Sequence, residues 1–219
     1  MTQREQIVEN AMRMFVSQGI KSVRMDDIAQ ELGISKRTLY EMFGDKEELL
    51  YLCLKRHMTL VNDCVAEKAR TGGNMLESIL IGFVEMTQYS ETNSRITGNL
   101  RKFYPSVHDR LHRELGENGS RRFKNAIEEC VNHGLIDGKA NIDLAIKMLY
   151  YMAIGIVARK EVILPDGLSV RDAFLHVVML FFRGISTPEG MRVIDDFAES
   201  GRFGLRIHDS DDNAEKVNE

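Results

Sequence analysis

The sequence predicts an all-helical protein with a helix-turn-helix near its N-terminus. Apolar residues recur at helical spacing along the chain, and no segment shows the alternation of a half-buried strand. Residues 25–50 read as a short helix, a turn that contains a glycine, a second short helix and the start of a third. This order is typical of a DNA-reading motif whose second helix enters the major groove.

Both ends of the first helix in the motif are indicated by the sequence. Asp26 and Asp27 stand in the first turn, where carboxylates offset the positive end of the helix macrodipole. Gly33 follows the last helical position, where a left-handed backbone conformation commonly ends a helix. Ser35 is suited to cap the next helix. The apolar stripe of the first helix consists of Ile28, Ala29 and Leu32.

The second helix, over residues 36–43, is predicted to expose a polar face. Its apolar residues, Leu39, Met42 and Phe43, share one side. At about 100° per residue, the opposite side centres on Arg37 and Glu41. The flanking positions hold Lys36, Thr38 and Tyr40. We expect this face to present cations, a phenol, a hydroxyl and one carboxylate to DNA.

A third helix is predicted to begin at Lys46, because Asp45 and Glu48 have the spacing of a capping box. A cation at a helix start opposes the macrodipole and costs roughly a few tenths of a kcal/mol. Free backbone N–H groups and an ammonium at one place suit a bound phosphate. The alternative is an ordinary solvated lysine, and the preceding motif favours the phosphate.

These residues together resemble a known family. Residues 4–50 are similar to the N-terminal domain of the TetR/AcrR family of transcriptional regulators, a resemblance that covers about the first quarter of the chain. The residues that carry it are Ile7, Val8, Ala11, Phe15, Gly19, Asp27, Ile28, Ala29, Leu32, Gly33, Ile34, Ser35, Thr38, Leu39, Tyr40, Phe43, Lys46, Leu49 and Leu50. Each motif is weak alone, and together they are specific.

The resemblance implies an all-helical homodimer with a C-terminal effector domain, usually a repressor that a small molecule releases from DNA. The residues that fall where the family touches DNA are Lys36, Arg37, Thr38, Tyr40 and Lys46. The family commonly has threonine where this chain has Arg24, so a capping hydroxyl is missing there. An arginine at this position can still reach a phosphate, and we include Arg24 among the expected DNA contacts.

The charge balance requires local placement of the cations. The 219-residue chain has a net charge of −4. Residues 1–50 hold seven Lys and Arg against nine Asp and Glu, a net charge of −2. General attraction of a polycation to DNA is therefore absent. We expect the acids of the motif to point away from Arg24, Lys36, Arg37 and Lys46.

The sequence predicts a cytoplasmic protein without cofactors. Cys53, Cys64 and Cys130 are odd in number and far apart, which favours free thiols in a reducing compartment over disulfides or zinc. Cys53 and Cys64 are read as buried structural thiols, with a redox sensor as the alternative. The N-terminus lacks the pattern of a signal peptide, and no apolar run approaches about 18 residues, so no membrane partner is expected.

After the motif, the sequence predicts a series of further helices. Helices are predicted over residues 46–69, 74–89, 94–103, 107–115, 120–133, 141–160, 169–183 and 187–197. We divide the chain into a DNA-binding domain (1–50), a ligand-binding and dimerisation domain (51–208) and an acidic, disordered tail (209–219). The helices over 141–160 and 169–183 are apolar around most of their circumference. Such helices must be covered on all sides.

A dimer would provide this cover, through two helices from each subunit. The representative interface residues are Leu149, Ile156, Val177 and Phe181. The alternative is that these helices are deep core helices of one chain. The resemblance places the family's dimer interface at the same helices.

An effector pocket is expected among the helices between residues 46 and 133. Aromatic and methionine side chains there would suit a largely apolar small molecule. The candidate lining residues are His57, Phe83, Met86, Tyr89, Phe103, Tyr104, His108, Tyr151 and Met152. Each is also consistent with ordinary core packing.

The sequence leaves three hypotheses for the function of the protein. The first is a dimeric repressor that binds a palindromic operator in double-stranded DNA and is released by a small molecule. The second is a DNA-binding protein of the same fold that a protein partner controls. The third is an all-helical enzyme, which the sequence disfavours because it has no GxSxG, HExxH, P-loop or GxGxxG motif.

Overall fold

The computed structural model describes residues 2–158, 164, 165 and 167–202, without the side chains of residues 90–95, 97 and 153–158. The described chain is all-helical, as the sequence predicts, and its one extended pairing is an isolated bridge between Ile136 and Ser186. The helices are α1 (Gln3–Gln18), α2 (Met25–Glu31), α3 (Lys36–Phe43), α4 (Lys46–Ala69), α5 (Met75–Thr87), α6 (Ser90–Phe103), α7 (Pro105–Leu111), the π-helical turn η1 (His112–Gly116), α8 (Glu117–Asn132), α9 (Ile142–Ala158), α10 (Val170–Ile185) and α11 (Pro188–Glu199).

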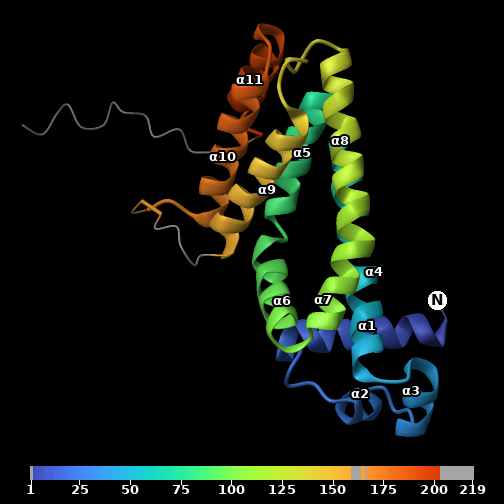
Figure 1. The fold of residues 1–219 in the computed structure, drawn as a ribbon. Helices are drawn as coiled ribbons and strands as arrows, with labels where there is room; N and C mark the ends of the chain where they lie inside the picture. Colours follow the sequence, from blue (N-terminus) through green and yellow to red (C-terminus); the bar gives the residue numbers. More distant parts are fainter. Residues whose placement is uncertain (1, 159–163, 166, 203–219) are drawn as a thin grey trace, which may run out of the picture.

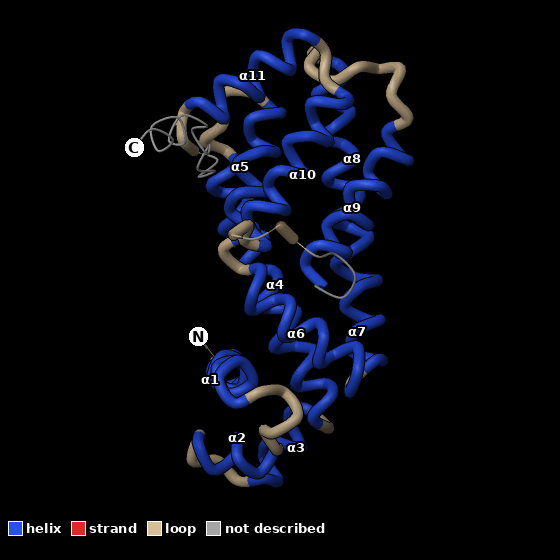
Figure 2. Tube along the Cα trace, turned by 90° about the vertical axis from the view of Figure 1, so that its left-hand side faces the viewer, coloured by secondary structure: helices blue, strands red, loops and turns tan. Residues whose placement is uncertain are grey.

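The molecule is elongated, with α1–α3 at one end and α9–α11 toward the other (Figure 1). In the view turned by 90°, α1 is seen end-on above α2 and α3 (Figure 2). Helix α4 leaves the α1–α3 bundle and runs into the rest of the molecule (Figure 1). Helix α4 therefore links the helix-turn-helix to the later helices.

Local sequence signals set the boundaries of these helices. The Ser35 hydroxyl accepts a hydrogen bond from the Thr38 N–H, and the Asp45 carboxylate accepts one from the Glu48 N–H. Both are N-caps of the kind that the sequence predicts. Gly33 adopts a left-handed φ of 63° in the turn between α2 and α3. That conformation favours glycine, because other residues would be strained there.

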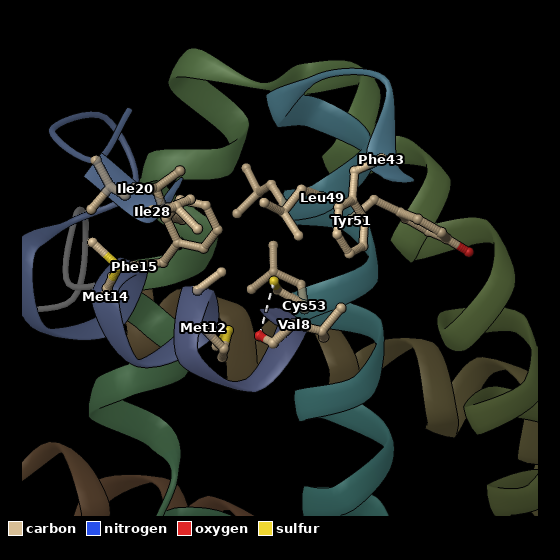
Figure 3. Close-up of a cluster of buried hydrophobic side chains, with 14 of the residues drawn as sticks. Val8, Met12, Met14, Phe15, Ile20, Ile28, Phe43, Leu49, Tyr51 and Cys53 are labelled. Carbon is tan, nitrogen blue, oxygen red and sulfur yellow. Dashed lines mark hydrogen bonds between the residues drawn. The ribbon is translucent and has the colours of Figure 1, made fainter. Parts of the chain in front are cut away.

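Two hydrophobic cores stabilise the described chain. The first joins α1–α3 to the start of α4, and also takes in Leu100 of α6 and Val107 and Leu111 of α7. Figure 3 shows part of it, with the Cys53 thiol donating to the Val8 carbonyl. The second core is built from α5, α8, α9, α10 and α11. Because the first core continues past residue 50, the division into domains 1–50 and 51–208 stays a prediction.

The largest difference from the predicted helices lies between residues 105 and 132. We expected two short helices, over residues 107–115 and 120–133. In the structure α7, η1 and α8 follow one another without a break in the helical backbone. Pro105 stands at the first turn of α7, where its missing N–H costs nothing. The predicted tail, residues 209–219, lies outside the described residues.

The thiols differ in exposure. Cys53 and Cys130 are buried, as expected for structural cysteines, and burial raises the pKa of each thiol to about 12. Cys64 is exposed, so our reading of it as a buried thiol was wrong. It lies on the later turns of α4, which the first core does not cover. In the part of the chain that is described, no helix is both long and apolar enough for a membrane span.

Polar contacts fasten the start of α4 to α7 and η1. Arg110 of α7 donates to Glu48 of α4 at 2.6 Å, and its guanidinium lies 3.4 Å from the centre of the Tyr51 ring. Glu114 of η1 accepts hydrogen bonds from Lys55 and Tyr51 of α4. The bond from Lys55, followed by the one from Tyr51, lowers the pKa of Glu114 to about 2.

We expect Glu114 to make the stability of the protein sensitive to acid. A carboxyl with a lowered pKa stabilises the fold fully above its ordinary pKa of 4.5, and this contribution is lost as the pH falls toward the folded value of about 2. In urea titrations, the stability advantage of the wild type over Glu114→Gln should shrink between these two pH values. Glu117→Gln, which changes an exposed carboxylate at the start of α8, is the control. A pH-independent difference between wild type and Glu114→Gln would contradict this assignment.

Candidate nucleic-acid interface

Helix α3 has one buried and one exposed face. Leu39 and Phe43 are buried in the first core, and Met42 packs against it. Arg37 lies on the opposite face, and 87% of its side-chain surface is exposed. Tyr40 is 46% exposed although it is aromatic. The core therefore fixes which side of α3 faces solvent, and this side holds Arg37 and Tyr40.

Each cation of this face has an acidic partner. Lys36 pairs with Asp26 of α2, and the Arg37 Nε lies 2.7 Å from Glu41, one turn along α3. We expected the acids of the motif to point away from the cations, and the structure corrects this. The reason is geometric: Glu41 follows Arg37 by four residues on one helix face, and α2 packs against α3.

These pairs leave the cations available to another anion. Both are exposed, with more than half of the Lys36 and Arg37 side chains in solvent. Exposed ion pairs contribute only about 0–1 kcal/mol each, so a phosphate or a base edge can replace the carboxylate at little cost. Glu41 also restrains the direction of the Arg37 guanidinium in the free protein.

Two further predicted DNA contacts lie at helix starts. Thr38 is half-buried, and its hydroxyl lies 2.7 Å from the Ser35 hydroxyl that caps α3. Arg24 is exposed at the N-cap of α2, where its side chain makes no capping bond. The Asp27 carboxylate instead accepts a hydrogen bond from the Arg24 N–H. This bond is the half of a capping box that the third helical residue supplies, and the half that a capping hydroxyl would supply is missing.

Lys46 is separated from this group. Its ammonium donates to the Ile20 carbonyl at 2.7 Å. It also lies 5.3 Å from the centre of the Tyr104 ring and 5.9 Å from that of Phe15. Its side chain is half-buried between α1, the turn that follows α1, and the junction of α6 with α7. The structure therefore gives Lys46 a set of intramolecular partners that the sequence did not indicate.

The predicted effector residues do not gather around one cavity. Phe83 packs in the second core against Phe123, Phe174 and Phe182. Met86, Tyr151 and Met152 are exposed. Phe103 and Tyr104 lie at the junction of α6 with α7, with Lys21 4.7 Å from the centre of the Phe103 ring. His57 and Tyr89 are half-buried, on α4 and at the start of α6, and His108 stacks on His112.

A cavity of about 370 Å³ lies elsewhere, between α4, η1 and α8. It is open to solvent. Its wall is formed by Thr59, Asn62, Asp63, Leu115, Asn118, Arg121 and Arg122, and these residues expose more apolar than polar surface to it. These residues were not predicted from the sequence, because the prediction relied on aromatic and methionine side chains. The adjacent arginines at 121 and 122 were the available signal.

The outer face of α9 and α10 is apolar and exposed. Tyr151 is 71% and Leu180 70% exposed, and Leu144, Met148 and Met152 are exposed as well. Leu149 is instead buried in the second core of its own chain, which accounts for its apolar character without a partner. Val177 and Phe181 are half-buried. The side chain of Ile156 lies outside the described residues.

Comparison with known proteins identifies the helix-turn-helix. Residues 7–51 match the family model described as bacterial regulatory proteins, tetR family. An HTH-type transcriptional regulator of Staphylococcus aureus (strain USA300) is 39% identical over 57 residues, which are 26% of this chain. The matched segment spans 31% of that relative's length. The family-model match thus concerns the N-terminal bundle.

The fold similarity extends over most of the chain. A TetR/AcrR-family regulator from Thermobifida fusca aligns with a TM-score of 0.62 and 25% identity, covering 83% of this chain and 97% of that one. The regulator FadR from Bacillus subtilis, solved with stearoyl-CoA, aligns with a TM-score of 0.65 and 16% identity, covering 83% and 98%. With the match over residues 7–51, these similarities show an N-terminal helix-turn-helix of the tetR family and, over most of the chain, the fold of a TetR/AcrR-family transcriptional regulator.

Proposed function

We propose that the protein is a dimeric, sequence-specific DNA-binding regulator of transcription, and that it acts as a repressor released by a small molecule. The DNA-binding part of this proposal rests on the two different faces of α3. Leu39 and Phe43 bury one face of α3 in the first core. The other face exposes Lys36, Arg37 and Tyr40 to solvent. A helix placed and divided in this way can enter the major groove. Repression, as opposed to activation, rests on the family resemblance.

Arg37 is the residue we assign to base recognition. Its guanidinium extends from the centre of the exposed face, and a bidentate contact to guanine is worth about 1–3 kcal/mol of discrimination. We expect Arg37→Ala to lose this discrimination while it keeps the fold, because the side chain fills no space in the core. The measurement is binding to the sequence that the wild type selects from random double-stranded DNA, compared with a scrambled sequence.

The matched control is Arg192→Ala. Arg192 is also an exposed helical arginine paired with a glutamate on its own helix, Glu189, and it lies on α11 at the opposite end of the molecule (Figure 1). This variant should bind the selected DNA like the wild type. Unchanged discrimination by Arg37→Ala would remove Arg37 from the interface.

A homodimer through α9 and α10 is supported by the exposed apolar residues on these packed helices. A recognition helix of eight residues buries too little surface to hold an operator alone. Two copies can read half-sites of a palindrome one or more helical turns apart. The candidate contacts are the exposed side chains Leu144, Met148, Tyr151, Met152 and Leu180, together with the half-buried Val177 and Phe181.

We expect Leu180→Glu to separate the dimer into folded monomers. The side chain is 70% exposed in one protomer, so a charge there would not disturb that protomer's core, but it would be costly inside an interface. Sedimentation at micromolar concentration measures the change. Leu60→Glu, at an exposed leucine of α4, is the control and should leave the oligomer intact. A wild type that sediments as a monomer would exclude the dimer.

Control by a small molecule is supported by the cavity between α4, η1 and α8. It is open to solvent, and its volume of about 370 Å³ is near the lower end of the range of ligand sites. Arg121 and Arg122 outnumber Asp63 in its wall and favour a ligand that has an anionic group beside an apolar part, whereas the sequence predicted a largely apolar effector. The alternative is control by a protein partner, for which no cavity is needed.

A first probe is stearoyl-CoA, which carries phosphates and is the ligand in the Bacillus subtilis structure. We expect it to weaken DNA binding by the wild type more than by the Arg121→Gln/Arg122→Gln variant, because the variant lacks the cations. Arg113→Gln is the control, since Arg113 is an η1 cation that does not line the cavity. If neither this probe nor a panel of anionic metabolites acts through the cavity, control by a protein partner is favoured.

A further inference from the structure

Two histidines lie beside each other at the junction of α7 with the π-helical turn η1. His108 belongs to α7, and His112 is the first residue of η1. Their rings stack with centres 6.3 Å apart and with planes only 3° from parallel. Side chains separated by four residues share one face of a helix. The two imidazoles therefore form a pair that a single small cation can reach.

The histidine pair lies on a face of α7 that the core does not use. Val107 and Leu111, one residue before each histidine, are buried in the first core. His112 is exposed, and 29% of the side-chain surface of His108 is exposed. The packing of the first core therefore does not account for the two rings, and both are accessible from solvent.

A carboxylate orients the first ring of the pair. The Oδ1 atom of Asp109 lies 3.0 Å from the Nδ1 atom of His108. When Nδ1 carries the proton and donates it to this carboxylate, the lone pair of Nε2 is left to bind a cation. Histidines that bind metals almost always donate their other ring N–H to a carboxylate, a carbonyl or water. His108 thus has the arrangement of a metal ligand whose second nitrogen is already paired.

The second ring has room to turn toward the first. Gly116 follows His112 by one helical turn, and a Cβ atom at residue 116 would lie 3.3 Å from the Nδ1 atom of His112. Because residue 116 is glycine, no side chain crowds the ring there. Both rings must lean toward a shared ion, since zinc lies only about 2.0–2.1 Å from a ligating nitrogen. Single π-helical turns such as η1 also occur frequently at functional sites.

We propose that His108 and His112 bind one divalent first-row metal ion of the kind that prefers imidazole, such as Zn²⁺. The described residues include no group of three or more histidines, cysteines, aspartates and glutamates suited to a metal, so the ion keeps positions for water or a small ligand. A bound ion connects α7 to η1, and Glu114 of η1 accepts hydrogen bonds from Lys55 and Tyr51 of α4. This site does not depend on the proposed DNA binding.

Titration calorimetry with Zn²⁺ on the untagged full chain tests the site. The wild type should bind one ion per chain. His108→Gln and His112→Gln should each lose this binding, because a single imidazole cannot chelate the ion. His133→Gln is the control, since His133 is an exposed histidine at the end of α8 whose Nδ1 atom lies 2.9 Å from a backbone carbonyl oxygen. This variant should bind Zn²⁺ like the wild type.

A variant that keeps both rings tests the role of the carboxylate. We expect Asp109→Ala to weaken zinc binding about ten- to a hundredfold, because it removes the group that orients His108. This variant should fold like the wild type, since 73% of the Asp109 side-chain surface is exposed. It therefore reports on the site even where a histidine variant does not fold.

Two spectroscopic measurements locate the ion. In NMR spectra, the ring signals of His108 and His112 should shift together when Zn²⁺ is added, while those of His133 stay in place. Amide hydrogen exchange at residues 108–116 should slow with Zn²⁺ in the wild type and not in His112→Gln, while the amides of α1 are unchanged. The proposal is overturned by a wild type that binds no Zn²⁺ at millimolar concentration, by wild-type affinity in both histidine variants, or by wild-type affinity in Asp109→Ala.

Discussion

The rest of the structure depends on the burial of the first turns of α4. Leu49, Leu50, Tyr51, Cys53 and Leu54 are all buried, and they point to several sides of the helix. A helix segment that is apolar all round must be enclosed. Here α1 packs on one side and α7 on another, and the same core extends to α2 and α3. The helix-turn-helix is therefore packed against the start of α4, and the later turns of α4 extend into the remainder of the protein.

This constraint explains why the polar contacts of α4 matter. The apolar core fixes α4 between α1 and α7 but leaves its rotation and small tilts less defined, because apolar contacts are not directional. Directional hydrogen bonds restrict these movements. The bonds from Arg110 to Glu48 and from Lys55 and Tyr51 to Glu114 supply them on the α7 side. Leu115, next to Glu114, lines the cavity. A movement of η1 at the cavity would therefore also move Glu114 and its hydrogen bonds to α4.

The features predicted correctly from the sequence depend on near neighbours. The caps at Ser35 and Asp45 and the left-handed Gly33 involve residues within three or four positions, and local rules cover that range. The partners of Lys46 lie 26 residues before it, at Ile20, and at Tyr104 after it. No periodicity or spacing indicates such a pairing. Likewise, the apolar pattern identified α9 and α10 as unusual helices, but only the packing shows that Leu149 is buried while Tyr151 and Leu180 are exposed.

The acids beside the cations of α3 bear on specificity. Asp26 and Glu41 neutralise much of the field of Lys36 and Arg37, and the whole chain carries a net charge of −4. Non-specific binding to DNA comes mainly from attraction between cations and phosphates, so this arrangement weakens it. In the proposed complex, Arg37 would exchange Glu41 for a base edge at a correct base pair and gain about 1–3 kcal/mol of discrimination, against the 0–1 kcal/mol typical of an exposed ion pair. At a wrong base pair there is little to replace Glu41. Under the proposed function, the acidic partners would therefore lower the affinity for DNA in general more than the affinity for the selected sequence.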